Sequence, residues 1–371
     1  MDYDAITIDT NILRHNGYKF SSGILAQLRQ FKNAGSKLIL SRVVVDEVRR
    51  HLTEEIVEVR QRHNDALGNL NRKNAISEGA STAIHDLIKA EASPQEIVDS
   101  VLGDFIESTG GILIDASLVD SNKILDLYFG IEPPFEKKAD KKHEFPDAIA
   151  LMSLEKWAED NDKRILAVSD DGGWIEYAKK SDRIDIEKDL AVALETLLID
   201  DEEAVRALVQ KALKRIEDDH GSPDYILIEQ KLKDDVQEID AYGEACSSFA
   251  LAEPGDLEAK YKSFSFWNFS DEYDFHILKH EADEVVIQIA ITVNAEISCD
   301  FDLSAWDGID REYVGITTTT STIEEEFEAS LLITFSTNIR EGGCEVIHAE
   351  LTDTPNSFDF GEVEPDHSFY E

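Results

Sequence analysis

The fold is decided by the stretch Ala5-Ile6-Thr7-Ile8-Asp9-Thr10-Asn11-Ile12-Leu13, near the start of the sequence. Its first four residues have the apolar, largely β-branched character of a short buried strand. Asp9 follows at once, so a carboxylate stands where the strand ends and a turn begins. In open α/β sheets, ligands bind in the crevice beyond the carboxyl ends of the strands. The pattern therefore predicts either a helix N-cap or a metal ligand at Asp9.

The chain has 371 residues, which exceeds one ordinary core and predicts two domains. Apolar residues make up 42% of it, enough for globular folding, and no apolar run is long enough to cross a membrane. Cys246, Cys299 and Cys344 lack the spacing of a metal site, and their odd number argues against a disulfide framework. The N-terminus lacks the basic and apolar regions of a signal peptide. These features predict a cytoplasmic protein with reduced thiols.

The net charge of −42 is unusual, and it is unevenly distributed along the sequence. Residues 1–200 carry 37 acidic and 25 basic side chains, whereas residues 201–371 carry 41 acidic and 11 basic ones. Bulk electrostatics therefore repel nucleic acid, so any binding of nucleic acid requires a local basic surface. The more acidic C-terminal half is not expected to recognise such a substrate.

Apolar strands alternate with helical segments over residues 1–200. Strands are expected at 4–8, 37–41, 111–115 and 164–169. Helices are expected at 21–34, in a long polar insertion at about 52–108, and from Pro146 to Trp157, where proline occupies the first turn. This alternation predicts an α/β domain with a central parallel sheet.

The pattern changes after residue 200. Two helices are expected at 201–242 as a connector, the first with apolar side chains at helical spacing. Between 243 and 371, apolar residues alternate with more polar ones, from Val285 to Phe301 and again from Phe327 to Phe335. Such long period-two alternation predicts an acidic, antiparallel β-rich domain, whose tail after Gly361 is expected to fray.

Acidic residues recur at equivalent places in the N-terminal pattern. Asp9 follows the first strand, Glu47 lies within two turns of the second, Asp147 opens a helix, and Asp170 and Asp171 follow the fourth strand. In a parallel sheet these positions meet at one edge, where carboxylates raise each other's pKa unless a cation neutralises them. Oxygen ligands suit Mg²⁺ or Mn²⁺, which activate water and neutralise charge on a phosphate. The pattern predicts metal-dependent hydrolysis of phosphodiesters without a covalent protein intermediate.

Residues 4–200 resemble the PIN-domain nucleases. The resemblance rests on four motifs, which are Ile8-Asp9-Thr10-Asn11, Val44-Val45-Asp46-Glu47-Val48, Pro146-Asp147-Ala148-Ile149-Ala150-Leu151 and Val168-Ser169-Asp170-Asp171-Gly172-Gly173-Trp174. It implies an α/β/α sandwich around a parallel sheet, with one or two divalent ions bound by three or four acidic residues. The long helical insertion is closer to the larger stand-alone bacterial members than to the short toxin type.

Carried over motif by motif, the resemblance implies that the catalytic metal ligands are Asp9, Glu47, Asp147 and Asp171. Asn11 and Ser169 match supporting polar positions of the family. Asp170 lies at a position that varies within the family, and its alternative role is to bind a second ion. Neighbours on a helix point about 100° apart, so only one of Asp46 and Glu47 faces the site easily, and we expect it to be Glu47.

Basic residues flank the predicted ligands in two groups. The first lies on the helix that carries Glu47 and comprises Arg42, Arg49 and Arg50. The second lies in the loop before Asp147 and comprises Lys137, Lys138, Lys141 and Lys142. Both groups suit a phosphate track. For the helix group, a solvated face with i,i+4 ion pairs is an equal alternative, whereas the loop favours a functional role because it delivers a predicted ligand.

The sequence thus predicts a metal-dependent endoribonuclease acting on single-stranded RNA, joined to an acidic module for assembly or regulation. Two alternatives stay open: a structure-selective DNA nuclease of the same fold, and a non-catalytic scaffold that binds RNA or protein partners. A scaffold is expected to lose one or more of the acids, and all are present here. Long strands with one apolar face need a covering layer, which predicts a homo-oligomer. No Gly-rich phosphate loop is present, so no nucleotide cofactor is expected.

Overall fold

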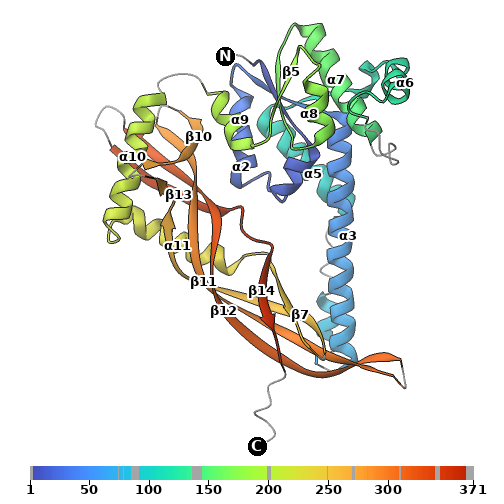
Figure 1. Cartoon of the computed structure of the whole chain (residues 1–371), viewed down its shortest axis with the longest axis vertical. Helices are drawn as coiled ribbons and strands as arrows, with labels where there is room; N and C mark the ends of the chain where they lie inside the picture. Colours follow the sequence, from blue (N-terminus) through green and yellow to red (C-terminus); the bar gives the residue numbers. More distant parts are fainter. Residues whose placement is uncertain are drawn as a thin grey trace, which may run out of the picture. The chain divides into compact units, whose positions relative to one another are not determined.

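The chain forms two units, Met1–Leu197 and Leu198–Glu371 (Figure 1). Each unit has its own buried apolar residues. The computed structural model describes residues 3–73, 75–77, 79–84, 92–135, 144–198, 202–248, 250–269, 272–281, 283–308, 311–338 and 343–364. The lysine-rich loop and the end of the acidic tail lie outside the described residues. None of the described helices is long and apolar enough to cross a membrane.

The N-terminal unit is built on a five-stranded parallel sheet with flanking helices, which confirms the predicted α/β fold (Figure 1). In spatial order its strands are β3 (Ile112–Ile114), β2 (Lys37–Ser41), β1 (Ala5–Ile8), β4 (Ile165–Val168) and β5 (Ile184–Glu187). β1 and β4 are buried along their whole length, with Ile8 opposite Val168. The strand order reverses between β1 and β4, and ligands bind at such a point in open α/β sheets.

Two segments of this unit differ from the prediction. The sequence pattern gives no indication of β5, because Ile184-Asp185-Ile186-Glu187 is short, half polar and lies at a sheet edge. The helix expected at 21–34 is replaced by α2 (Gly23–Ala26) and the 3-10 helix η1 (Gln27–Lys32). Gly23 has a φ of +61°, a left-handed conformation that prevents a regular helix from running through it from Ser21.

Helices carry the segments that leave the strands. They are α1 (Thr10–His15), α3 (Arg42–Arg72), α5 (Pro94–Thr109), the 3-10 helix η2 (Ala116–Leu118), α6 (Ser121–Gly130), α7 (Phe145–Asn161), α8 (Gly172–Ala178) and α9 (Leu190–Thr196). Ser41 caps α3, whose first turns bury Val44, Val45 and Val48, while most of its later residues are exposed. The predicted helical insertion therefore consists mainly of the outer part of α3 and of α5.

The C-terminal unit is dominated by antiparallel strands, as the alternating pattern predicts. One sheet contains β10 (Phe275–His280), β11 (Glu284–Asp307), β12 (Glu312–Asn338) and β13 (Gly343–Thr352), with β7 (Leu251–Phe266) also paired to β11. Two small sheets pair β6 (Tyr242–Cys246) with β14 (Ser357–Glu362) and β8 (Asn268–Phe269) with β9 (Glu272–Tyr273). The alternating apolar residues of β11, from Val285 to Phe301, are buried.

Helices α10 (Glu202–Asp218) and α11 (Pro223–Gln237) share the core of this C-terminal unit. Val209 and Leu213 of α10 and Leu232 of α11 belong to the same buried cluster as the apolar residues of β11 and β12. In addition, Asp224 of α11 accepts a hydrogen bond from the backbone N of Val346 on β13 over 3.0 Å. The chain therefore supplies its own covering layer, which removes the reason given above for expecting a second subunit there.

Candidate active site

Asp9 lies at the end of β1, between the two central strands. Its backbone N donates to the carbonyl of Val168 over 3.0 Å, and Ser169 Oγ donates to Asp9 Oδ2 over 2.8 Å. Asp9 occupies the N-cap position of α1, yet its side chain makes no capping hydrogen bond. Only 4% of this residue is exposed. Of the two roles that the sequence allows for Asp9, the helix cap is therefore not the one observed.

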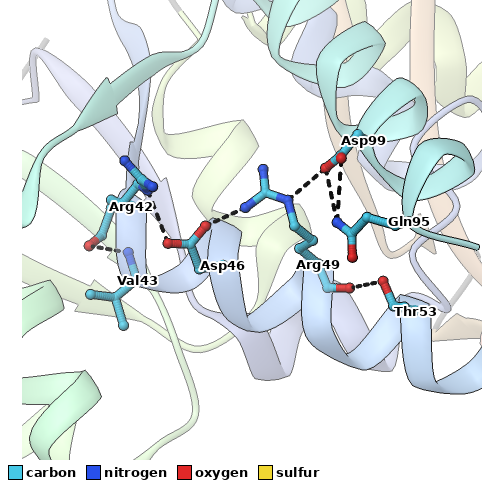
Figure 2. A network of polar contacts seen from close by, with 8 residues as sticks. Arg42, Val43, Asp46, Arg49, Thr53, Gln95 and Asp99 are labelled. Atoms are coloured by element: carbon cyan, nitrogen blue, oxygen red, sulfur yellow. Dashed lines mark hydrogen bonds and ion pairs between the residues drawn. The ribbon is translucent and has the colours of Figure 1, made fainter.

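Glu47 and its neighbour Asp46 take different directions from α3. Thr10 Oγ1 donates to Glu47 Oε2 over 2.9 Å, which brings Glu47 to the turn that follows β1. Asp46 is exposed and pairs with Arg42, at 3.0 Å, and with Arg49 (Figure 2). The helix thus directs Glu47 toward the end of β1 and Asp46 toward a surface network.

Asp147 lies in the first turn of α7, where its Oδ1 accepts a hydrogen bond from the indole Nε1 of Trp174 over 2.9 Å. Trp174 is fully buried in α8, so this donor is held in place by packing on all sides. The contact joins two helices whose residues are 27 positions apart in the sequence. α7 and α8 together therefore fix the orientation of the Asp147 carboxylate.

Asp171 caps α8, with Oδ1 accepting from the backbone N of Gly173 over 2.7 Å and of Trp174 over 3.1 Å. Its own backbone N donates to Ser169 Oγ over 3.1 Å, so Ser169 contacts both Asp9 and Asp171. A side chain at Gly173 would lie 3.0 Å from Asp171 Oδ1 and 3.1 Å from Pro134, which explains the glycine. Asp170 is exposed.

Burial and mutual repulsion raise the pKa of two of these carboxyl groups. The pKa of Asp9 rises to about 6, chiefly because the group is buried, and also because Asp171 and Glu47 carry like charges nearby. The pKa of Asp147 rises to about 7 for the same first reason, with further contributions from Asp9, Asp171 and Glu47. Asp9 and Asp147 are therefore partly desolvated at the carboxyl end of the sheet, where the charges of Glu47 and Asp171 act on both of them.

This donor set fits a hard divalent cation. Its ligand atoms are carboxylate oxygens, the type that Mg²⁺ and Mn²⁺ prefer, and a cation would relieve the repulsion that raises the pKa of Asp9 and Asp147. Within the described part of the chain, no three His, Cys, Asp or Glu side chains are placed so that they could ligate one ion together. Mg²⁺ is usually bound by one or two carboxylates plus waters and substrate phosphates, so the arrangement suits such an open site.

The other residues predicted at the site have varied positions. Arg49 pairs with Asp99 on α5 over 2.8 Å as well as with Asp46, so the two arginines of Figure 2 are held by acidic partners. Arg50 is exposed and contacts the ring of His51 over 3.0 Å. Asn11 is exposed on α1, and the four loop lysines lie outside the described residues.

Sequence reasoning missed two side chains that orient the carboxylates. Thr10 lies next to Asp9 in the first motif, for which the sequence predicts roles only at Asp9 and Asn11. In the structure Thr10 is the residue that contacts Glu47. Trp174 closes the last motif, but the hydrogen bond from its indole to Asp147 depends on the packing of α7 against α8. A hydroxyl directly after the strand-end acid is the one sequence signal that points to Thr10.

Comparison with known protein families agrees with this geometry. Residues 6–174 match the family model of the PIN domain. The N-terminal unit contains a PIN domain. The match begins in β1 and ends at Trp174, so this PIN domain includes all four carboxylates and both orienting residues. The C-terminal unit has no family match, and no curated protein or solved structure matches the chain. The fold is thus of the nuclease type, which is commonly metal-dependent.

Proposed function

We propose that the PIN domain is a divalent-metal-dependent endoribonuclease that hydrolyses phosphodiester bonds of single-stranded RNA. The observation that carries the proposal is that Asp9 and Asp147 are partly desolvated at the carboxyl end of the sheet, where the charges of Glu47 and Asp171 act on both of them. The RNA preference rests on the family resemblance. Desolvated carboxylates that repel one another are destabilising without a cation, so their presence together favours a catalytic role over a purely structural one.

The protein groups divide into carboxylates and the residues that position them. Ser169 holds Asp9, Thr10 holds Glu47, and the indole of Trp174 holds Asp147. When bound, Mg²⁺ or Mn²⁺ supplies an activated water and neutralises the charge that develops on the phosphate. The fixed carboxylates limit reorganisation during the reaction, because their hydrogen bonds exist before the substrate arrives.

The decisive experiment incubates the full chain with labelled single-stranded RNA and DNA, with Mn²⁺ or with EDTA. We expect internal cleavage of RNA that requires the metal and that is lost in Asp9→Asn. Preferential cleavage of branched or flapped DNA would instead favour a structure-selective DNA nuclease. Binding of RNA without cleavage of any substrate, at every metal tested, would favour the non-catalytic scaffold.

For the C-terminal unit we propose a regulatory role that acts through charge. Because α10, α11 and β14 share a buried apolar cluster with the sheet, burial gives no reason for assembly there. Residues 201–371 nevertheless carry 41 acidic against 11 basic side chains, which disfavours the approach of a polyanion. Residues 1–197 alone should therefore bind RNA more tightly than the full chain at low salt, with the difference shrinking as salt is added. A loss of oligomer mass on truncation, with unimproved binding, would support assembly instead.

A further inference from the structure

An aromatic cluster connects α6 to the start of α7. The ring of Tyr128 on α6 lies 5.4 Å from that of Phe135 and 5.0 Å from that of Phe145, centroid to centroid. Phe135 and Phe145 are 5.0 Å apart in an edge-to-face arrangement. Because aromatic pairs of this geometry are stabilising, the three rings fasten α6 to the first turn of α7.

This cluster is attached to the candidate active site at two points. Phe145 is the first residue of α7, two positions before Asp147. Pro134, next to Phe135, lies so close to Gly173 that a Cβ there would be 3.1 Å away, and Gly173 donates its backbone N to Asp171. Phe145 and Phe135 are therefore joined, through Asp147 and through Pro134 and Gly173, to the segments that hold two of the carboxylates.

Phe129 extends this cluster into solvent. None of the residues of α6 is buried. Lys123 and Leu127 line a cavity of about 540 Å³ that α7 and α8 also line, and Tyr128 belongs to the aromatic cluster. Phe129 is 76% exposed, and its ring lies 5.2 Å from that of Tyr128 at 74°. Tyr128 already attaches α6 to α7, so this exposed ring is not needed to hold the helix.

We propose that Phe129 is a stacking platform for an unpaired base of the strand whose phosphate lies at the four carboxylates. The inference rests on the proposed nuclease function and adds the requirement for a single-stranded segment beside the cleaved bond. Every base has a π-face, so a lone ring binds single strands with little sequence preference. Paired bases in a duplex are already stacked on their neighbours and cannot cover such a ring.

The test measures the binding of a short fluorescein-labelled RNA to the full chain. The chain carries Asp147→Asn throughout, so that the RNA is not cleaved. We expect Phe129→Ala to weaken binding roughly tenfold, as removal of a stacking ring does elsewhere. Phe129→Tyr and Phe129→Trp should retain wild-type affinity. Leu125→Ala is the matched control, because Leu125 is 46% exposed one turn earlier on the same helix and has no ring.

A second series moves one abasic residue along the RNA. At one position of the RNA, loss of the base should weaken binding to the protein that has Phe129. Loss of the same base should not weaken binding to Phe129→Ala any further. Additive losses at every position would overturn the proposal. Wild-type RNA binding by Phe129→Leu would also overturn it, because a leucine side chain cannot stack on a base as an aromatic ring does. Cleavage by the native chain is measured first. If the native chain cleaves no RNA, the proposed function is wrong. If it cleaves RNA but Phe129→Ala leaves RNA binding unchanged, only the stacking platform is wrong.

Discussion

The indole Nε1 of Trp174 donates a hydrogen bond to Oδ1 of Asp147 over 2.9 Å, and this bond joins α8 to the first turn of α7. The backbone N of the same tryptophan donates to Asp171 Oδ1 over 3.1 Å. One fully buried residue therefore orients two of the four carboxylates. Its bond to Asp147 opposes the rise in pKa that burial causes at that carboxyl group.

We expect Trp174→Phe to lower kcat/KM about tenfold or more near neutral pH, as losing a hydrogen bond to a charged group does. Without the indole donor the pKa of Asp147 rises further, so the carboxylate forms only at higher pH. The acid limb of the pH–rate profile should move to higher pH accordingly. Trp157→Phe, on α7 but away from these contacts, is the control. An unshifted profile with intact folding would show that the indole bond does not tune Asp147.

Glu47→Gln and Asp46→Asn form a matched pair on α3. Glu47 accepts a hydrogen bond from the hydroxyl of Thr10, whereas Asp46 is exposed and paired with Arg42 and Arg49. We expect Glu47→Gln to lower activity by at least about 100-fold, beyond the loss typical of residues that only support a metal ligand. Asp46→Asn should stay within a few-fold of wild type, because exposed ion pairs contribute little. Equal losses in single-turnover cleavage would show that both acids serve the site.

Asp171→Asn separates a catalytic role from a capping role. Asn is as good an N-cap as Asp, so the variant should keep α8 and lose little stability. It does remove the negative charge that acts on Asp9 and Asp147. We expect a large loss of activity at an almost unchanged Tm, and only a small change for the exposed Asp170→Asn. A greater loss for Asp170→Asn would mean that the acid of this turn was assigned to the wrong residue.

The sequence predicts the parts of this site that depend on strand ends. Asp9, Ser169 and Asp171 lie where they do because β1 and β4 are short apolar strands, side by side in a parallel sheet. Helical geometry allows only one of Asp46 and Glu47 to face the site easily, and the family resemblance implies that it is Glu47. Local pattern and topology suffice for these residues.

Contacts between distant elements were beyond sequence reasoning. The bond from Trp174 to Asp147 depends on how α7 packs against α8, and the pair Arg49–Asp99 links residues 50 positions apart. The sequence predicts i,i+4 partners for the arginines of α3, and Arg42 does pair with Asp46, but Arg49 also pairs with Asp99 on α5. β5 was missed because a short, half-polar edge strand has no distinctive period.

The raised pKa values also predict how metal-free stability depends on pH. Folding raises the pKa of Asp9 to about 6 and that of Asp147 to about 7, from 3.8 in each case. Over the interval between the unfolded and folded values the native state binds more protons than the unfolded chain, so these groups make stability fall as pH rises. With EDTA, Tm should therefore drop between about pH 5 and pH 7 more in the native protein than in Asp9→Asn/Asp147→Asn. Mn²⁺ should restore the native Tm at pH 7 and leave the double variant unchanged. Parallel Tm curves for the two proteins with EDTA would contradict the desolvated, mutually repelling carboxylates on which the metal site depends.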